Sequence, residues 1–226
     1  PKTQAALLEA MEEHQVTAGG RRHPLAEPFF VLATQNPIEQ EGTYTLPEAQ
    51  LDRFMFQVMV DYPGEDEEFE IIRRTTSDAT PRATTVLDHE DVVALQQLVR
   101  QIPVADHVVR YAINLCRLSR PTRNASGNSE DFVDRYVQWG AGPRAGQSLV
   151  LGAKARAVLG GRSFVSIEDI RAVVYPVLRH RIITSFEAEA DRVVPDDVVD
   201  WLLNQTPAET PIDNPAVARI FRSNDQ

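Results

Sequence analysis

The chain contains, at residues 46–54, the segment Leu46-Pro47-Glu48-Ala49-Gln50-Leu51-Asp52-Arg53-Phe54. It follows closely on a second segment, Phe29-Phe30-Val31-Leu32-Ala33-Thr34-Gln35-Asn36-Pro37. The second segment is apolar up to a polar end, which is typical of a strand covered on both faces of a parallel sheet. The two segments together indicate a buried strand with a polar tip and a helix end that presents an arginine. That combination is half of a phosphate-chemistry site.

The other half of such a site is missing from this sequence. Its only lysines are Lys2 and Lys154, and neither lies in the Gly-x-x-x-x-Gly-Lys-Ser/Thr loop that holds phosphates in P-loop enzymes. Residues 58–61 imitate an apolar strand that ends in a magnesium-binding aspartate. However, Tyr62 stands where a catalytic glutamate would follow, so a simple strand end is the better interpretation.

Composition limits the classes of function. A net charge of −10 argues against broad electrostatic binding to nucleic acid or to an anionic membrane. The single cysteine, Cys116, excludes an intramolecular disulfide and suits a reducing cytosol. The five histidines have no metal-ligand spacing, so we expect no metal site. The sequence has no signal peptide and no apolar run long enough for a membrane span, which favours a cytoplasmic location.

The pattern of the chain predicts a small α/β part followed by a helical part. It starts at Pro1 directly in helix-like sequence, which we interpret as a fragment boundary, although a clipped initiator methionine would look the same. In the first part, the pattern predicts a helix over 3–13, a β-hairpin over 15–25 with a Gly19-Gly20 turn, and strands over 29–34 and 54–60.

A helix is predicted directly after Gly64, and beyond Pro81 the pattern is almost wholly helical. Acidic residues 65–70 suit a helix N-terminus, and a box-like Ser166-Ile167-Glu168-Asp169 suits another. The predicted helices begin at 65, cover 92–102 and 108–116, begin after Gly142-Pro143, and run from 166 to 177, with a loop over 120–134. The tail after about residue 207 has scattered prolines and is expected to be mobile.

Asn36 is the first candidate site residue. Ligands of α/β sheets collect at the carboxyl ends of strands, where an amide can orient a water molecule against a phosphate. The simpler alternative is that Asn36-Pro37 only makes a turn, which both residue types favour.

Arg53 and Arg144 are the other two candidates. Arg53 could form a weak surface pair with Asp52, or it could be an arginine finger that reaches a γ-phosphate bound by another subunit. Arg144 follows Gly142-Pro143 at a helix start, where a cation opposes the helix dipole. It is therefore either an ordinary exposed arginine or a mild indication of an anionic ligand.

Taken together, these segments resemble the MoxR family of AAA+ ATPases. The resemblance is specific through Phe54 and looser but continuous to about Pro195, and Gly142-Pro143-Arg144-Ala145 resembles the family's small-residue-Pro-Arg-Ala element. The matching segments are residues 6–13 with 15–17, 28–37, 38–44 and 46–54.

The resemblance implies a role for each candidate. Asn36 looks like the sensor 1 residue, Arg53 like the arginine finger acting in trans, and Arg144 like sensor 2, which contacts nucleotide in its own subunit. The hairpin at 15–25 looks like the pre-sensor hairpin that faces a ring's pore. In relatives the Walker A loop and the Walker B strand lie upstream of Pro1. The chain therefore resembles a C-terminal fragment, and its apolar strand edges are expected to pair between chains.

The fold class that follows is an α/β P-loop NTPase core remnant over residues 1–62 and an all-α lid domain over 63–226. The resemblance further implies a full-length parent that binds ATP with Mg²⁺, hydrolyses it as a homo-oligomeric, hexameric ring, and remodels or matures partner proteins. The fragment alone is expected to bind no nucleotide tightly and to be inactive, and its client protein is unknown.

Two alternatives stay open from the sequence. One is a non-catalytic helical interaction module, which the absence of a phosphate loop upstream would favour. The other is a related AAA+ motor acting on nucleic acid, or a metal-chelatase subunit, both of which share an Asp-Arg-Phe element. The acidic balance counts against the motor.

Overall fold

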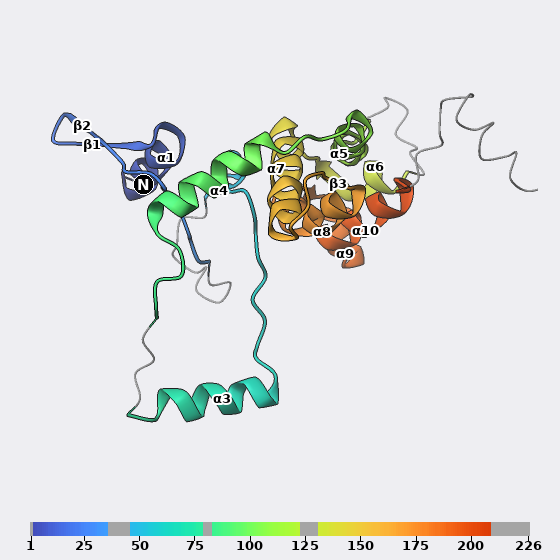
Figure 1. Ribbon diagram of the computed structural model, residues 1–226. Helices are drawn as coiled ribbons and strands as arrows, with labels where there is room; N and C mark the ends of the chain where they lie inside the picture. Colours follow the sequence, from blue (N-terminus) through green and yellow to red (C-terminus); the bar gives the residue numbers. More distant parts are fainter. Residues whose placement is uncertain (1, 36–45, 79–82, 123–130, 209–226) are drawn as a thin grey trace, which may run out of the picture. The chain divides into compact units, whose positions relative to one another are not determined.

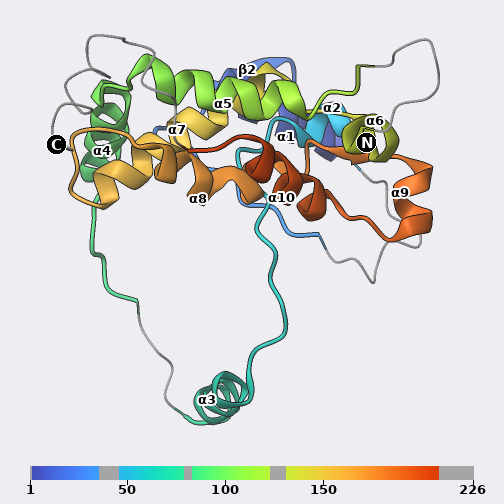
Figure 2. The same ribbon diagram turned by 90° about the vertical axis from the view of Figure 1, so that its right-hand side faces the viewer.

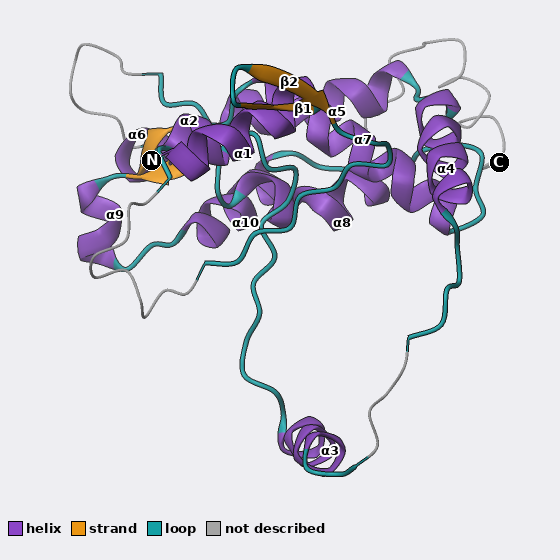
Figure 3. Cartoon of the chain, turned by 90° about the vertical axis from the view of Figure 1, so that its left-hand side faces the viewer, coloured by secondary structure: helices purple, strands orange, loops and turns teal. Residues whose placement is uncertain are grey.

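A computed structural model describes residues 2–35, 46–78, 83–122 and 131–208. By its contacts the chain divides into two compact units, one of residues 1–34 with 57–97 and one of residues 35–56 with 98–226. Most of the described chain is helical (Figure 3). The described residues 46–56 thus belong with helices that follow much later in the sequence. The predicted domain boundary at 62/63 stays a prediction.

The first unit contains the predicted β-hairpin, which is confirmed. Its strands pair antiparallel with Val16 opposite His23. Gly19 and Gly20 both have positive φ angles, 58° and 76°, as a two-residue turn between twisted strands requires. The elements of this unit are α1 (Lys2–Glu13), β1 (Gln15–Ala18), β2 (Arg21–Pro24), α3 (Glu65–Thr75) and the greater part of α4 (His89–Gln101).

The hairpin is joined to α1 by hydrogen bonds. The backbone N–H of Thr17 donates to Glu9 Oε2 (3.3 Å), and the Thr17 hydroxyl donates to the other carboxylate oxygen. At the other end, the N–H of Leu25 donates to the carbonyl of His14 (2.8 Å). Figure 3 shows the two strands beside α1. The helix predicted over 3–13 is therefore confirmed together with the turn that follows it.

The strands predicted over 29–34 and 54–60 are wrong for this structure. Both segments lie within the described residues, and neither pairs into a sheet. Phe30 and Leu32 are 81% and 83% exposed, and Val60 is 92% exposed. A strand is completed by backbone hydrogen bonds to a neighbouring strand, and no described segment provides them here. An apolar run indicates that a segment tends to be buried, but it does not identify a neighbouring strand with which the segment pairs.

The second unit is a group of packed helices (Figure 1). Helix α7 packs against α5 and α8, and α8 also packs against α5 and α10; the quarter-turn view shows the same neighbours (Figure 2). Besides the end of α4, its elements are α2 (Glu48–Leu51), α5 (Asp106–Leu118), α6 (Phe132–Tyr136), β3 (Val137–Trp139), α7 (Pro143–Leu159), α8 (Ile167–Leu178), β4 (Ile183–Thr184), α9 (Phe186–Asp191) and α10 (Pro195–Gln205).

The core of this unit takes a fully buried side chain from each of its four main helices. They are Leu115 on α5, Leu149 on α7, Ile170 on α8 and Leu202 on α10. Full burial of such a side chain contributes about 1.5–3 kcal/mol relative to exposure. The helical pattern predicted beyond Pro81 is therefore confirmed in this unit.

Residues 132–134 correct the predicted loop over 120–134. They belong to α6, whose N-cap residue Asp131 accepts a hydrogen bond from the backbone N–H of Val133 (3.2 Å). The ring of Phe132 stacks on Trp201 of α10, with centroids 5.6 Å apart. This distant aromatic partner stabilises a turn that local composition did not favour. Residues 123–130 of the predicted loop, and the tail from 209 onward, lie outside the described residues.

The sequence did not predict the short antiparallel pair formed by β3 and β4. Val137 of β3 lies opposite Thr184 of β4. Because β3 leads toward α7 and β4 follows α8, this pairing fixes the entry to one helix beside the exit of the other.

Asp169 organises the start of α8, where the predicted capping box is confirmed. The carboxylate is 1% exposed and accepts hydrogen bonds from both terminal nitrogens of Arg162 (2.7 and 2.6 Å). It also accepts from the backbone N–H of Ser166 (3.0 Å). Hydrogen bonding to Arg162 is the main cause that lowers the pKa of Asp169 to about 2.

We predict that Asp169→Asn lowers the free energy of unfolding of the helical unit by about 2–3 kcal/mol at pH 7, because Arg162 loses its charged partner. The folded pKa lies below the ordinary value of 3.8, so this stabilisation is complete above pH 4 and disappears as the pH falls toward 2. Urea unfolding followed by tryptophan fluorescence measures it. The stability curves of variant and parent should converge near pH 2.

The matched control is Asp197→Asn. Asp197 holds the same capping position in α10 and accepts from the N–H of Val194 (2.8 Å), but its side chain is exposed. We expect a loss of no more than about 1 kcal/mol. Equal losses in the two variants would contradict a special role for the Arg162 pair.

Candidate functional site

The structure places two of the three predicted site residues in the same unit. Arg53 lies just after α2 and Arg144 in the first turn of α7, and both belong to the helical unit. Asn36 lies outside the described residues, so its role stays a prediction.

Arg144 is exposed at a helix start that suits an anion. The N-cap residue Gly142 is extended and provides no capping side chain, and Pro143 occupies the first helical position. The first turn contains no acidic residue. Backbone N–H groups at such an end attract negative charge, and the arginine adds a positive charge beside them.

The segment that leads into α7 is fixed against the end of α5. The N–H of Ala141 donates to the hydroxyl of buried Ser119 (2.9 Å), which in turn donates to the carbonyl of Cys116 (2.7 Å). Arg120 donates to the carbonyl of Ala141 (2.9 Å). At Gly140 a Cβ atom would lie 2.2 Å from the Ser119 carbonyl oxygen, so only glycine permits this approach. The position of Arg144 is therefore determined by packed backbone.

Arg53 lies in a tight turn, residues 52–55, which we call the finger turn. Its backbone N–H donates to Gln50 (3.2 Å), and the N–H of Phe54 donates to Leu51 (3.1 Å). The side chain of Arg53 is half-buried. The turn continues the short helix α2, and a helix of four residues has little stability of its own. Something outside the turn must hold it.

That support comes from Arg181, a residue that the sequence analysis missed. Arg181 follows α8 and is only 6% exposed. Its Nε donates to Asp52 Oδ1 (2.8 Å), and Nη2 donates to the carbonyls of Asp52 (2.9 Å) and Phe54 (2.7 Å). Nη1 donates to the carbonyl of Met55 (3.2 Å). One guanidinium thus binds three of the four residues of the finger turn.

The same guanidinium is also held by the helices. Nη1 donates to the carbonyl of Val177 in α8 (2.5 Å), and Nη2 lies 3.4 Å from the hydroxyl of Ser148 in α7. Burial lowers the pKa of Arg181, and hydrogen bonding to Asp52 opposes that shift. Arginine nevertheless stays charged in proteins, so this is a buried cation that requires its partners. Arg144 is close enough for its charge to act on the same group.

His180 adds a second contact to the finger turn. Its Nε2 lies 3.0 Å from the carbonyl oxygen of Phe54. A carbonyl only accepts, so Nε2 carries the proton in this contact. Burial, followed by the charge of Arg181, lowers the pKa of His180 to about 4. The imidazole is therefore neutral near pH 7.

Cys116 lies near this network and is not a reactive thiol. It is 3% exposed, and burial raises its pKa to about 11, although the charges of Arg120 and Arg181 oppose the shift. Nucleophilic chemistry requires the thiolate, so we assign Cys116 to packing.

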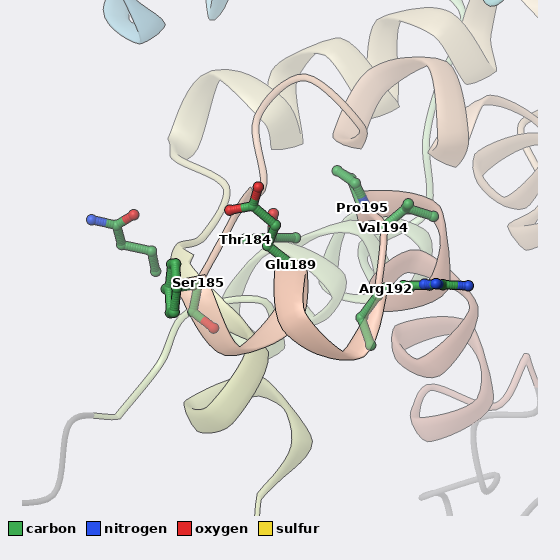
Figure 4. A pocket seen from close by; sticks show the side chains of 9 residues that line it. Thr184, Ser185, Glu189, Arg192, Val194 and Pro195 are labelled. Atoms are coloured by element: carbon green, nitrogen blue, oxygen red, sulfur yellow. The ribbon is translucent and has the colours of Figure 1, made fainter.

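A separate open groove of about 550 Å³ lies between β3, β4 and the start of α10. Glu189 and Arg192 line it together with Thr184, Ser185 and Pro195, and Arg192 extends on the side away from Thr184 and Ser185 (Figure 4). Neither Arg53 nor Arg144 lines this groove.

The described residues contain no group of three or more His, Cys, Asp or Glu side chains that could hold a metal ion. Within the same residues, no helix is long and apolar enough to cross a membrane. The site assembled here is cationic: it can contact phosphate oxygens, but it offers no ligand set for magnesium.

Two family models match parts of this chain. Residues 1–56 match the family model "ATPase family associated with various cellular activities (AAA)", and residues 129–201 match the "AAA lid domain" model. A crystal structure of a candidate ATPase from Cytophaga hutchinsonii superposes with a TM-score of 0.83 at 36% identity, over 92% of this chain and 63% of that chain.

Two named relatives identify the branch of the family. Chaperone MoxR1 of Mycobacterium tuberculosis is 40% identical over 89% of this chain and 52% of its own length, and protein MoxR of Methylorubrum extorquens is 31% identical over 87% and 60%. The chain spans between 52% and 64% of the length of the curated relatives that it matches. On these matches the chain belongs to the MoxR family of AAA+ ATPases.

Proposed function

We propose that this chain supplies the sensor and arginine-finger half of an ATP-hydrolysing AAA+ ring. The Walker A loop and the Walker B aspartate and glutamate would come from residues upstream of Pro1, and ATP would bind there with Mg²⁺. The ring would be a homo-oligomer, a hexamer in our proposal, located in the cytoplasm. It would use hydrolysis to remodel or mature partner proteins, and the name of the relative Chaperone MoxR1 supports that role.

The observation that carries this proposal is the fixed finger turn. An arginine finger stabilises transition-state charge on a phosphoryl group and can be worth about 10³–10⁵ in rate. It does so only if it is held in place before the reaction, because electrostatic stabilisation depends on preorganised groups. Arg53 sits within a turn whose flanking carbonyls are held by the buried Arg181.

Arg144 has a complementary role in this proposal. It would contact the nucleotide of its own subunit from the start of α7, while Arg53 reaches the nucleotide of the neighbouring subunit. Asn36 would orient the attacking water as sensor 1, and the hairpin of β1 and β2 would face the pore. The exposed cation at an uncapped helix start supports the nucleotide contact of Arg144.

We predict that the 226-residue chain alone has no measurable ATP turnover. It lacks a Gly-x-x-x-x-Gly-Lys-Ser/Thr loop, so nothing in it can hold the phosphates and magnesium for attack. A coupled phosphate-release assay of purified chain, beside the protein that also carries the upstream loop, measures this. Turnover by the pure chain at ordinary ATPase rates would overturn the proposed division of the active site.

In the protein that carries both halves, Arg53→Ala should reduce kcat by about 10³-fold or more and change nucleotide affinity little. The finger acts on the transition state of the neighbouring subunit's site. Mixing Arg53→Ala subunits with subunits that retain Arg53 should therefore partly restore activity. Subunits with a dead phosphate loop but an intact Arg53 would complete the sites of the Arg53→Ala subunits.

The control is Arg73→Ala on α3, where the side chain is 64% exposed and pairs with Glu70 one turn away. It should leave kcat unchanged. If mixed rings form and Arg53→Ala activity is not restored, Arg53 does not act in trans.

A further inference from the structure

Arg181 is a buried charged residue beside the finger turn. Its side chain is 2% exposed, yet its Nε and terminal nitrogens donate to a carboxylate and to four backbone carbonyls. Three of those carbonyls, on Asp52, Phe54 and Met55, belong to the finger turn. A side chain that contributed only apolar packing to the core would not form these hydrogen bonds to one turn.

We propose that Arg181 is a positioning residue for Arg53, and that it holds the finger in the geometry that the neighbouring active site requires. This inference rests on the proposed function of Arg53. Arg181 touches neither nucleotide nor water in the proposal. It acts through the backbone on both sides of Arg53, from a site 128 residues later in the chain.

The chemistry of the guanidinium fits this task better than that of an ammonium group. Arginine presents five N–H donors in a rigid planar fork, whereas lysine presents three donors on a flexible stem. The fork is what lets one side chain reach the Asp52 carboxylate and the Phe54 carbonyl at 2.8 and 2.7 Å. Lysine at this position would keep the charge but could not satisfy the same acceptors.

The network also joins the finger turn to the helix that carries Arg144. Ser148 lies on α7 one turn after Arg144, and its hydroxyl is 3.4 Å from Arg181 Nη2. Phe56, just after the finger turn, packs against Gly152 on the same helix, where an added Cβ would meet its ring at 3.1 Å. The finger turn and Phe56 therefore pack against α7 and α8, and Arg181 provides the polar contacts of this packing.

The test uses Arg181→Lys in the complete ATPase, the protein with both halves of the site. We expect kcat to fall about 10- to 100-fold, which is the scale of a misplaced catalytic group, with nucleotide affinity within about twofold of the parent. The activity should be restored in part by subunits that have a dead phosphate loop and normal Arg181. Such rescue in trans is the readout that a merely structural defect would not give.

Arg179→Lys is a matched control. Arg179 lies two residues away and forms its own bidentate pair with Asp196 (3.1 and 2.9 Å), and its side chain is 16% exposed. Among the described residues, its guanidinium donates to Asp196 and not to the finger turn. The variant keeps its charge and loses a bidentate contact of the same kind, but away from the finger turn, so kcat should stay within about twofold of the parent.

Asp52→Asn is a second variant in case Arg181→Lys fails to assemble. It removes the charged acceptor but leaves the carbonyl acceptors of the turn, and it should show the same loss of kcat and the same rescue in trans. The inference is overturned if either variant assembles and keeps parental kcat, or if its loss is not restored by mixing. The proposed function of Arg53 fails separately if Arg53→Ala itself keeps parental kcat.

Discussion

A buried guanidinium is the constraint on which the rest of this site depends. Removing Arg181 from water is costly unless every donor finds an acceptor, and breaking such a network typically costs about 3–5 kcal/mol. Its acceptors come from the finger turn and from α8, and the hydroxyl of Ser148 on α7 lies at the limit of hydrogen-bonding distance. The turn that carries Arg53 is therefore fixed by the electrostatics of the helical unit and not by its own short helix.

The contacts of Arg181 also explain why the segment that contains the finger turn associates with the helices. Asp52, far ahead in the sequence, meets Arg181 through an ion pair of 2.8 Å, and Phe54 meets both His180 and Arg181 through its carbonyl. The neutral state of His180 agrees with this packing, because a second cation beside Arg181 would repel it. Half-buried Arg53 and exposed Arg144 thus belong to one compact unit.

The sequence predicted features whose causes are local. The Gly19-Gly20 turn, the Asp169 capping box and the start of α7 at Pro143 depend on residues within one turn of each other. The predicted strands over 29–34 and 54–60 required partner strands, which a local sequence pattern cannot identify.

The family resemblance held, while the roles of Asn36, Arg53 and Arg144 stay predictions. Arg181 was missed because Arg179, His180 and Arg181 follow an apolar helix, as solvated cations at a helix C-terminus commonly do. The signal available was the apolar Ile182-Ile183 directly after it.

A double-mutant cycle between Asp52→Asn and Arg181→Met in the 226-residue chain tests most directly whether Arg181 holds the finger turn through Asp52. Both tryptophans, Trp139 and Trp201, lie in the helical unit, so their fluorescence during urea unfolding reports on that unit. We expect the two losses in free energy of unfolding to be coupled by at least about 1 kcal/mol, since the residues share one hydrogen-bond network. Losses that add within about 0.5 kcal/mol would mean that Arg181 does not hold the finger turn through Asp52.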